Sequence, residues 1–239
     1  LQRRLDVKRG LNTAGYISGY RGSPLGGYDT ALWRAKSHLD TYKIKFQPGV
    51  NEDLAATACW GTQQVGLRPG AQYDGVFSIW YGKGPGVDRS GDALKHGNMA
   101  GTSKNGGVLV LAGDDHGAKS STTAHQSEQA LIAAMIPIFY PSSVQEYLDY
   151  GLYGFELSRF SGAWVGIKCV GDIVEGSANV SLDTLGFEPS LPDFPLPEEG
   201  VHIRWPDKPV EQEKRLISIK LKAVEAFVKI NQLNIVTHK

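Results

Sequence analysis

The sequence predicts an α/β protein in which a mostly parallel sheet carries helices on both faces, giving three layers. Two observations lead to this prediction. Short runs rich in β-branched and aromatic residues alternate with longer helical patterns, which is typical of βα units. The runs are also apolar along most of their length, as strands are when both faces of a sheet are covered.

The predicted strands and helices follow one another along the chain in a regular order. The strands are AGYISG at 14–19, KIKFQ at 43–47, GVFSIW at 75–80, GVLVLA at 107–112, IPIFY at 136–140 and AWVGIKC at 163–169. The helices between them are predicted at 25–40, 52–66, 87–101, 126–134 and 144–160. Because helical segments separate the strands, neighbouring strands are expected to be parallel.

Residues 11–170 are predicted to form the α/β domain. Prolines then crowd 171–206, so this segment is predicted to be an arm or linker that holds no regular ladder or helix. The last segment, 207–239, places apolar residues such as Ile217 and Leu221 at helical spacing, which predicts an amphipathic helix leading to a further domain. The chain begins without Met and stops just as an apolar run starts, so we expect a fragment of a longer polypeptide.

Composition limits the possible functions. The chain has 239 residues, of which 41% are hydrophobic and 21% charged, close to the values of globular proteins. Its 25 basic and 25 acidic side chains give zero net charge, which argues against a nucleic-acid partner. Cys59 and Cys169 are too few for a disulfide framework, which fits a reducing cytoplasm, and no run of about 20 apolar residues predicts a membrane span.

Ligands of doubly wound sheets bind at the carboxyl ends of the strands, so the loops that follow the strands are the places for a site. The first loop, GYRGSPLGGYDT at 19–30, joins a strand to a helix. Its glycines let the backbone approach a ligand, Pro24 suits a first helical position, and Ser23 is placed to cap the helix. A capped turn without a ligand explains the same residues, and the loop matches neither a Walker sequence nor GxGxxG.

Two acids stand at the start of the second helix, in NEDLAATACWGTQQ at 51–64. Asn51 is a good N-cap, and Glu52 and Asp53 would lie in the first turn beside the positive end of the helix dipole. Helix capping and the dipole therefore offer a sufficient explanation. However, the helix behind the acids is built of small apolar residues, which predicts burial, and a buried carboxyl group must find a partner or change its protonation state.

The third loop and its helix, WYGKGPGVDRSGDALKHGN at 80–98, combine a glycine-rich turn with basic side chains. Together these side chains offer a place for an anionic substrate, although an exposed helix face explains the same charges. They are Lys83, Arg89, Lys95 and His96.

The fourth loop, GDDHGAKSSTTAHQSEQA at 113–130, is rich in carboxylate and imidazole groups, which suit divalent ions. The groups belong to Asp114, Asp115, His116 and His125. Their spacing is no recognised ligand signature, and a polar loop that caps the next helix explains them without an ion. We therefore predict no bound metal here.

Read in order, these loops resemble the pyrimidine-binding domain of the 2-oxoacid:ferredoxin oxidoreductases. The likeness is greatest to the indolepyruvate ferredoxin oxidoreductases whose catalytic regions are fused in one polypeptide. The matching stretches are GYRGSP, PGVNEDLAATACWGTQQ, KHGNMAG and VLVLAGDDHGAKSSTTAHQSEQ. The resemblance covers about residues 11–232, and the DD, SS and EQ pairs of the last stretch are its most distinctive part.

The resemblance implies a thiamine diphosphate enzyme that oxidatively decarboxylates an arylpyruvate, passes the acyl group to coenzyme A and sends electrons through iron–sulfur clusters to ferredoxin. In such enzymes a glutamate of this domain hydrogen-bonds the pyrimidine ring of the cofactor, and Glu52 holds the matching position. Gly22, Ser23 and Pro24 match the cofactor-binding turn, in which the usual hydroxyl residue is Thr. The residues implied on the substrate side are Ser23, Arg21, Lys95 and His96.

One departure from the family limits what the chain is expected to do. Nothing resembles the GDG-containing stretch that binds magnesium and diphosphate, and cluster cysteines are missing from the sequence. We therefore expect the fragment to be inactive alone, with magnesium and iron–sulfur clusters elsewhere in the full enzyme, and its site to be completed by another domain in a homodimer. Two alternatives remain open: a metal-dependent hydrolase that uses the fourth loop, and a non-catalytic dimerisation module of the same fold.

Overall fold

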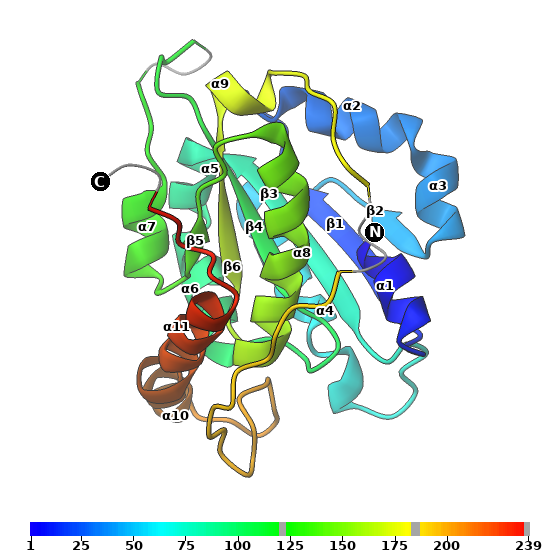
Figure 1. Cartoon of the computed structure of the whole chain (residues 1–239), viewed down its shortest axis with the longest axis vertical. Coiled ribbons are helices and arrows are strands. Elements are labelled where there is room, and N and C mark those ends of the chain that lie inside the picture. The colour runs from blue at the N-terminus through cyan, green and yellow to red at the C-terminus, as the bar shows by residue number, and fades with distance from the viewer. Residues whose placement is uncertain (120–122, 183–186, 237–239) are drawn as a thin grey trace.

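The strands form a parallel sheet, as the sequence predicts. The structure is a computed structural model that describes residues 1–119, 123–182 and 187–236. The strands are β1 (Ala14–Gly19), β2 (Ile44–Phe46), β3 (Val76–Lys83), β4 (Val108–Asp114), β5 (Ile138–Phe139) and β6 (Val165–Val170). Within these described ranges they pair in parallel in the order β2-β1-β3-β4-β6-β5 (Figure 1).

Helices cover both faces of this sheet, which confirms the three-layer prediction. One face carries α2 (Gly26–Arg34), α3 (Lys36–Thr41) and α8 (Val144–Ser161). The other carries α4 (Glu52–Thr62), α5 (Gly84–Arg89), α6 (Gly91–Ala100) and α7 (Glu128–Ala133). Strand β4 shows why both faces are apolar, since Leu109 packs into the core under α8 while Val108 and Val110 pack into the opposite core.

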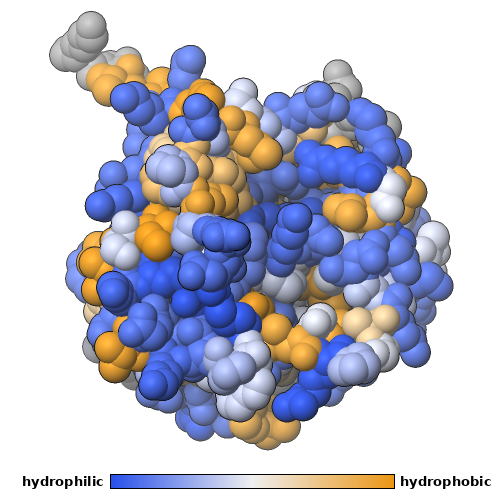
Figure 2. Space-filling view, turned by 90° about the horizontal axis from the view of Figure 1, so that it is seen from below, coloured by the Kyte–Doolittle hydropathy of each residue, from blue (hydrophilic) through white to orange (hydrophobic). Residues whose placement is uncertain are grey.

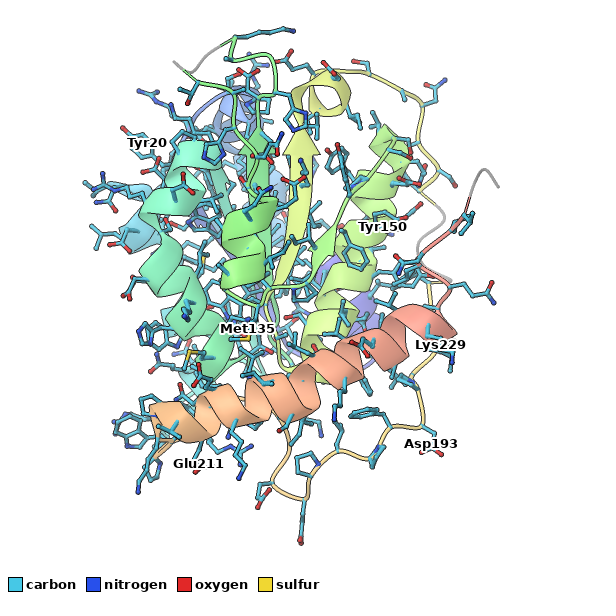
Figure 3. The ribbon with its side chains drawn as sticks, turned by 90° about the vertical axis from the view of Figure 1, so that its left-hand side faces the viewer. Tyr20, Met135, Tyr150, Asp193, Glu211 and Lys229 are labelled. Carbon is cyan, nitrogen blue, oxygen red and sulfur yellow. The ribbon has the colours of Figure 1, made fainter. Side chains whose placement is uncertain are left out.

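A long helical segment follows the proline-rich arm, within the segment 207–239 for which a helix is predicted. It consists of α10 (Pro209–Arg215), the π-helical turn η2 (Leu216–Lys220) and α11 (Leu221–Ile230). The segment crosses the amino end of the sheet, from Glu211 near one side to Lys229 near the other (Figure 3). Its first part packs on α6 and its last part on α8.

Three shorter helices complete the described structure. They are α1 (Gln2–Lys8), the 3₁₀ turn η1 (Val65–Leu67) and α9 (Gly171–Val174). The prediction that 171–206 holds no helix is wrong at its start, where α9 lies ahead of the prolines; beyond α9, the described part of this segment holds no further helix or strand. The last three residues of the predicted C-terminal segment, 237–239, lie outside the described residues.

Two predicted helices are each divided in two. The predicted helix at 25–40 breaks at Ala35, between α2 and α3, and the one at 87–101 breaks at Ser90, between α5 and α6. Both residues adopt the bridge conformation, with φ and ψ of −85° and 9° for Ala35 and of −90° and 5° for Ser90. This bridge conformation interrupts regular helical geometry, and a hydrophobicity pattern does not reveal it.

The order of the strands leaves the centre of one face without a crossover helix. Among the described elements, two connections pass over this face: β1 to β2 through α2 and α3, and β5 to β6 through α8. Both connections lie at the sides of the sheet. An apolar cavity of about 790 Å³ remains between them, lined by residues that include Tyr28, Ile79, Leu109 and Tyr147. Cys169 also lines this cavity, and burial raises the pKa of its thiol.

The amino end of the molecule is mostly hydrophilic, with scattered hydrophobic patches, when it is viewed from below (Figure 2). In the part of the chain that the structure describes, none of the helices combines the length and the apolar character that a membrane span requires.

Candidate active site at the carboxyl edge of the sheet

The carboxyl ends of the parallel strands meet at one edge, which lies at the top of Figure 1 and is called the carboxyl edge below. Tyr20, the first residue after β1, marks this edge in Figure 3. The loop that leads to α4 returns to the same edge, because the Gly49 amide donates to the carbonyl of Gly19 at 2.8 Å. The four loops that the sequence singles out therefore all reach one region.

Glu52 is the first residue of α4, and its backbone is fixed by neighbours. The Asn51 side chain accepts a hydrogen bond from the Leu54 amide at 2.8 Å, so Asn51 is the helix cap, as predicted. The indole of Trp80 donates to the Glu52 carbonyl at 2.9 Å. Ala55, Ala56 and Cys59 bury α4 against the sheet, which leaves Glu52 only 9% exposed. Capping and backbone anchoring thus do not use the Glu52 carboxyl group.

The side chain of Glu52 rests on the glycine-rich start of α5. A Cβ atom added at Gly86 would lie 2.6 Å from Cγ of Glu52, so only glycine leaves room for this carboxylate. The nearest charge is the Arg89 guanidinium, whose Nε lies 4.0 Å from Oε2 and whose side chain is 59% exposed. None of the described residues donates a hydrogen bond to the Glu52 carboxylate. The Glu52 side chain keeps 12% of its surface exposed and its oxygens are not fully enclosed, so the carboxylate can be reached from the carboxyl edge.

The first loop packs against the ends of β3 and β4. A Cβ at Gly22 would lie 2.8 Å from Cδ of Lys83, the last residue of β3. Pro24 lies on Gly113 of β4, where an added Cβ would be 3.2 Å from the proline Cδ. Ser23 between them is half-buried, and Arg21 is exposed.

The predicted capping role of Ser23 is wrong. Helix α2 begins at Gly26, after Leu25, so Ser23 and Pro24 lie in the turn before the helix rather than at its cap and first position. Leu25 is buried against Gly113, and this anchor sets the start of the helix further along the chain.

Lys95 and His96 lie apart from Glu52, on the exposed side of α6. The His96 ring is stacked with Trp60 at a centroid distance of 6.4 Å, and its Nε2 lies 3.6 Å from Oδ1 of Asp92. Trp60 is eight residues after Glu52 in α4, about 12 Å along the helix at the usual rise. The structure therefore does not bring Lys95 and His96 to the carboxyl group of Glu52.

The fourth loop is anchored by Asp114 at the end of β4. The Asp114 carboxylate is completely buried and accepts hydrogen bonds from the Ser127 amide at 2.9 Å and from its hydroxyl at 2.6 Å. Lys168 of β6 lies 3.6 Å away and also pairs with Glu128. Burial opposes ionisation of Glu128, but the hydrogen bond from Lys168 lowers the pKa of this carboxyl below its usual value.

His125 lies between two carboxylates. Its Nε2 is 2.8 Å from Oδ2 of Asp88 on α5, and its Nδ1 is 3.7 Å from Oδ1 of Asp114. The alternative of a metal-dependent hydrolase has no support in the described ranges, because no three His, Cys, Asp or Glu side chains there converge around a metal position. Ser120 and Ser121, the SS pair of the family resemblance, lie outside the described residues.

Sequence reasoning missed two parts of this region. It did not assign a role to Gly84 and Gly86, although the motif GKGPG places them directly after β3 and close approach is the usual use of such glycines. It also considered His125 only as a candidate metal ligand or as part of a polar capping loop, and assigned it no partner. The Asp88 partner of His125 is 37 residues away in the chain, so no local spacing signals the pair.

Comparison with known proteins agrees with the resemblance in the sequence. No known family profile matches the chain. Over 156 residues, the chain is 27% identical to the indolepyruvate oxidoreductase subunit IorA of Methanothermobacter marburgensis. This stretch is 65% of the chain and 22% of the relative, so the chain spans about a fifth of the length of this curated relative.

A solved structure shows the same fold. The thiamine diphosphate-dependent 4-hydroxybenzoylformate decarboxylase of Rhodococcus jostii RHA1 superposes with a TM-score of 0.50 at 13% identity, over 78% of this chain and 32% of the decarboxylase. The two likenesses together fit a thiamine diphosphate pyrimidine-binding domain. They support a relation to thiamine diphosphate enzymes, and leave substrate and reaction to be proposed.

Proposed function

We propose that this chain is the pyrimidine-binding part of a thiamine diphosphate-dependent 2-oxoacid:ferredoxin oxidoreductase, in which Glu52 hydrogen-bonds the pyrimidine ring of the cofactor. The Glu52 carboxyl group carries this proposal. It is largely buried at the carboxyl edge, where parallel sheets bind ligands, and its only partner among the described residues is the exposed Arg89 at 4.0 Å. Because Asn51 caps the helix, capping does not account for Glu52.

The residues of the carboxyl edge fit an aminopyrimidine ring. Such a ring offers a basic nitrogen that can share a proton with a carboxyl group, and Glu52 has a carboxyl group without a donor of its own. Burial strengthens such a contact, because the low local dielectric increases the interaction between proton, carboxylate and nitrogen. Gly22, Ser23 and Pro24 are proposed to border the cofactor from the first loop. When bound, thiamine diphosphate supplies the carbanion chemistry of decarboxylation.

The remaining parts of the proposal concern the whole enzyme. Indolepyruvate or another arylpyruvate is the proposed substrate, with coenzyme A as acyl acceptor and ferredoxin as electron acceptor in the cytoplasm. Magnesium, the diphosphate site and the iron–sulfur clusters would come from other domains, and a homodimer is the proposed assembly. Ser23 and Arg21 are proposed to face the substrate. Lys95 and His96 remain predictions for that role, at a distance from Glu52.

The test is the Glu52→Gln variant of the whole enzyme that contains this region. Glutamine has nearly the same size but cannot exchange a proton with the ring, and positioned acid–base groups contribute roughly 10²–10⁴ in rate. We expect indolepyruvate-dependent reduction of ferredoxin to fall at least about 100-fold. Thermal unfolding should shift little, because the Glu52 side chain makes no hydrogen bond within the described residues.

Asp53→Asn is the matched control, since Asp53 occupies the same helical turn and feels the same dipole. Its turnover should remain close to that of the wild type. Full turnover in Glu52→Gln would show that the region is only a scaffold, as in the alternative of a non-catalytic module. An equal loss in both variants would point to the helix dipole rather than to one carboxyl group.

A further inference from the structure

Helix α5 supports two side chains that come from distant parts of the chain. Glu52 of α4 rests on Gly86, and His125, from the loop before α7, rests on Gly84. A Cβ added at Gly84 would lie 2.0 Å from Nδ1 of His125, and one added at Gly86 would lie 2.6 Å from Cγ of Glu52. The two glycines are two residues apart, so a movement of α5 changes the surroundings of both side chains together.

The last turn of α5 contacts the same two side chains a second time. Asp88 pairs with His125 at 2.8 Å, and the adjacent Arg89 approaches Glu52 at 4.0 Å. The pair with His125 is the stronger one, because its nitrogen lies within hydrogen-bond distance of Asp88, whereas Arg89 stays 4.0 Å from Glu52; each pair joins one buried and one exposed side chain. His125 therefore contributes more than Arg89 to holding this helix at the carboxyl edge.

The opposite side of His125 faces the end of β4. Its Nδ1 is buried, has no hydrogen-bond partner among the described residues, and lies 3.7 Å from the carboxylate of Asp114. Asp114 is fixed in turn by Ser127 and Lys168. His125 thus lies between α5, which it contacts at Gly84 and Asp88, and a rigid, fully buried point of the sheet.

We propose that His125 is a positioning residue of the site: by pairing with Asp88 and packing between Gly84 and the buried Asp114, it fixes α5 and thereby the Gly86 surface on which the Glu52 carboxyl group rests. This inference depends on the function proposed above. Displacement of a reacting group by about 1 Å can reduce a rate by about 100-fold, so a small movement of α5 is expected to have a measurable effect.

The experiment compares His125→Ala, His125→Gln and Asp88→Asn in the whole enzyme, with His38→Ala, on the exposed surface of α3, as control. In His125→Ala we expect kcat to fall about tenfold with KM nearly unchanged, since geometry rather than substrate binding is altered. Without cofactor, the backbone amides of Gly84 and of residues 86–89 should exchange hydrogen faster than in the wild type. His125→Gln keeps a donor for Asp88 and should recover most of both effects, and Asp88→Asn should show smaller changes in the same direction.

Unchanged exchange in α5, or unchanged kcat, in both His125→Ala and Asp88→Asn would overturn the inference. So would an equal effect in the His38→Ala control. Failure of the proposed function is recognised separately, because Glu52→Gln would then keep full turnover whatever happens at His125. If only the His125 variants keep full turnover, Glu52 retains its role and the positioning inference alone is wrong.

Discussion

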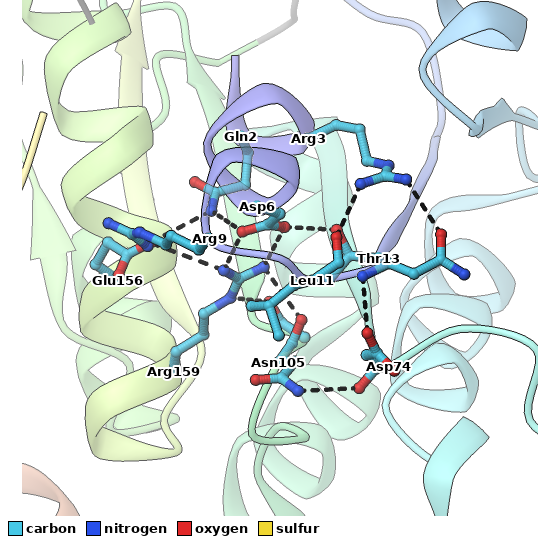
Figure 4. Close-up of polar contacts among 12 residues, drawn as sticks. Gln2, Arg3, Asp6, Arg9, Leu11, Thr13, Asp74, Asn105, Glu156 and Arg159 are labelled. Atoms are coloured by element: carbon cyan, nitrogen blue, oxygen red, sulfur yellow. Dashed lines mark hydrogen bonds and ion pairs between the residues drawn. The ribbon is translucent and has the colours of Figure 1, made fainter. Parts of the chain in front are cut away.

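The carboxylates of Asp6, at the amino end of the sheet, and Glu52, at the carboxyl edge, differ in how they are paired. At the amino end, Arg159 donates to both carboxylate oxygens of Asp6, at 2.6 and 2.9 Å, and Thr13 adds a third hydrogen bond at 2.6 Å (Figure 4). At the carboxyl edge Asp114 is also well paired, with Ser127 and Lys168, but within the described residues the Glu52 carboxylate has only Arg89 at 4.0 Å, and Nδ1 of His125 has no hydrogen-bond partner.

This difference separates charges that hold the fold from charges that serve a site. A buried charge is costly unless it is paired and hydrogen-bonded, so the Asp6 and Arg159 pair is understood as a structural anchor between α1 and α8. Glu52 has only the exposed Arg89, at 4.0 Å, to offset this cost within the described residues. A ligand that offers a proton or a hydrogen-bond donor would offset it further, which is why Glu52, and not the Asp6 pair, marks the candidate site.

The largest effect is expected from Arg159→Met, which breaks the amino-end pair. The change leaves the completely buried Asp6 carboxylate without its cation, and breaking a buried pair costs roughly 3–5 kcal/mol. Urea denaturation at pH 7 should show this loss, while the exposed Arg34→Met control should stay close to the wild type. A loss under about 1 kcal/mol would contradict the structural role of the anchor.

Acid provides a second measurement on the same pair. Burial alone would raise the pKa of Asp6, but the hydrogen bonds and charge of Arg159 lower it below the ordinary value of 3.8. The pair therefore contributes its full stability above pH 3.8, and this contribution is lost as the pH falls through the lower pKa of the folded state. Arg159→Met should lose less stability than the wild type over this acid range.

The next effect is expected at the carboxyl edge, from Gly86→Ala. The new Cβ would lie 2.6 Å from Cγ and 2.9 Å from Oε1 of Glu52, so the carboxyl group must move. We expect turnover of the whole enzyme to fall about 100-fold, as for a displacement of about 1 Å. Gly61→Ala is the control in α4, since nothing lies within 4 Å of a Cβ there, and it should stabilise the helix slightly. Equal turnover in the two variants would show that the position of Glu52 is not critical.

Much of the fold can be predicted from the sequence because it follows local patterns. Strand β1 has the predicted bounds, and β2 falls within the predicted 43–47, since β-branched and aromatic runs signal strands directly. Helix α1 was not predicted. Its buried residues include Gln2 and Asp6, polar groups that are stable inside only because Glu156 and Arg159 lie opposite them. A pairing across some 150 residues leaves no local pattern.

The candidate site could likewise be predicted only in part. Glu52 could be singled out from the sequence because an acid, an N-cap and a helix of small residues occur together. Its surroundings could not, because the contacts with Gly86 and Arg89 arise from the packing of α4 against α5. The break at Ser90 follows the same rule: this buried residue ends α5 and begins α6, and tertiary packing rather than propensity decides where.

Lys220 is an exception at the amino end, because this buried cation has no carboxylate partner. It gives the prediction with the smallest expected effect. It is completely buried in the π-helical turn, and its ammonium group faces backbone carbonyls instead of a carboxylate. The distances are 3.2 Å to Met99, 3.3 Å to Gly162 and 3.4 Å to Asn98. Burial is the main cause that lowers the pKa of Lys220 from 10.5 to about 7.

The Lys220→Met variant tests this comparison between the two ends. The free energy of unfolding is measured for the variant and for the wild type from pH 7 to pH 9. The unfolded lysine stays protonated over this range while the folded one loses its proton, so the wild type should gain stability as the pH rises, by about 2 kcal/mol. The methionine variant should lack this gain, and the exposed Lys222→Met control should keep it. Parallel pH curves for the wild type and Lys220→Met would mean that carbonyls alone satisfy a buried ammonium group. In that case the lack of a hydrogen-bond donor for the Glu52 carboxylate among the described residues would be weaker evidence for a ligand.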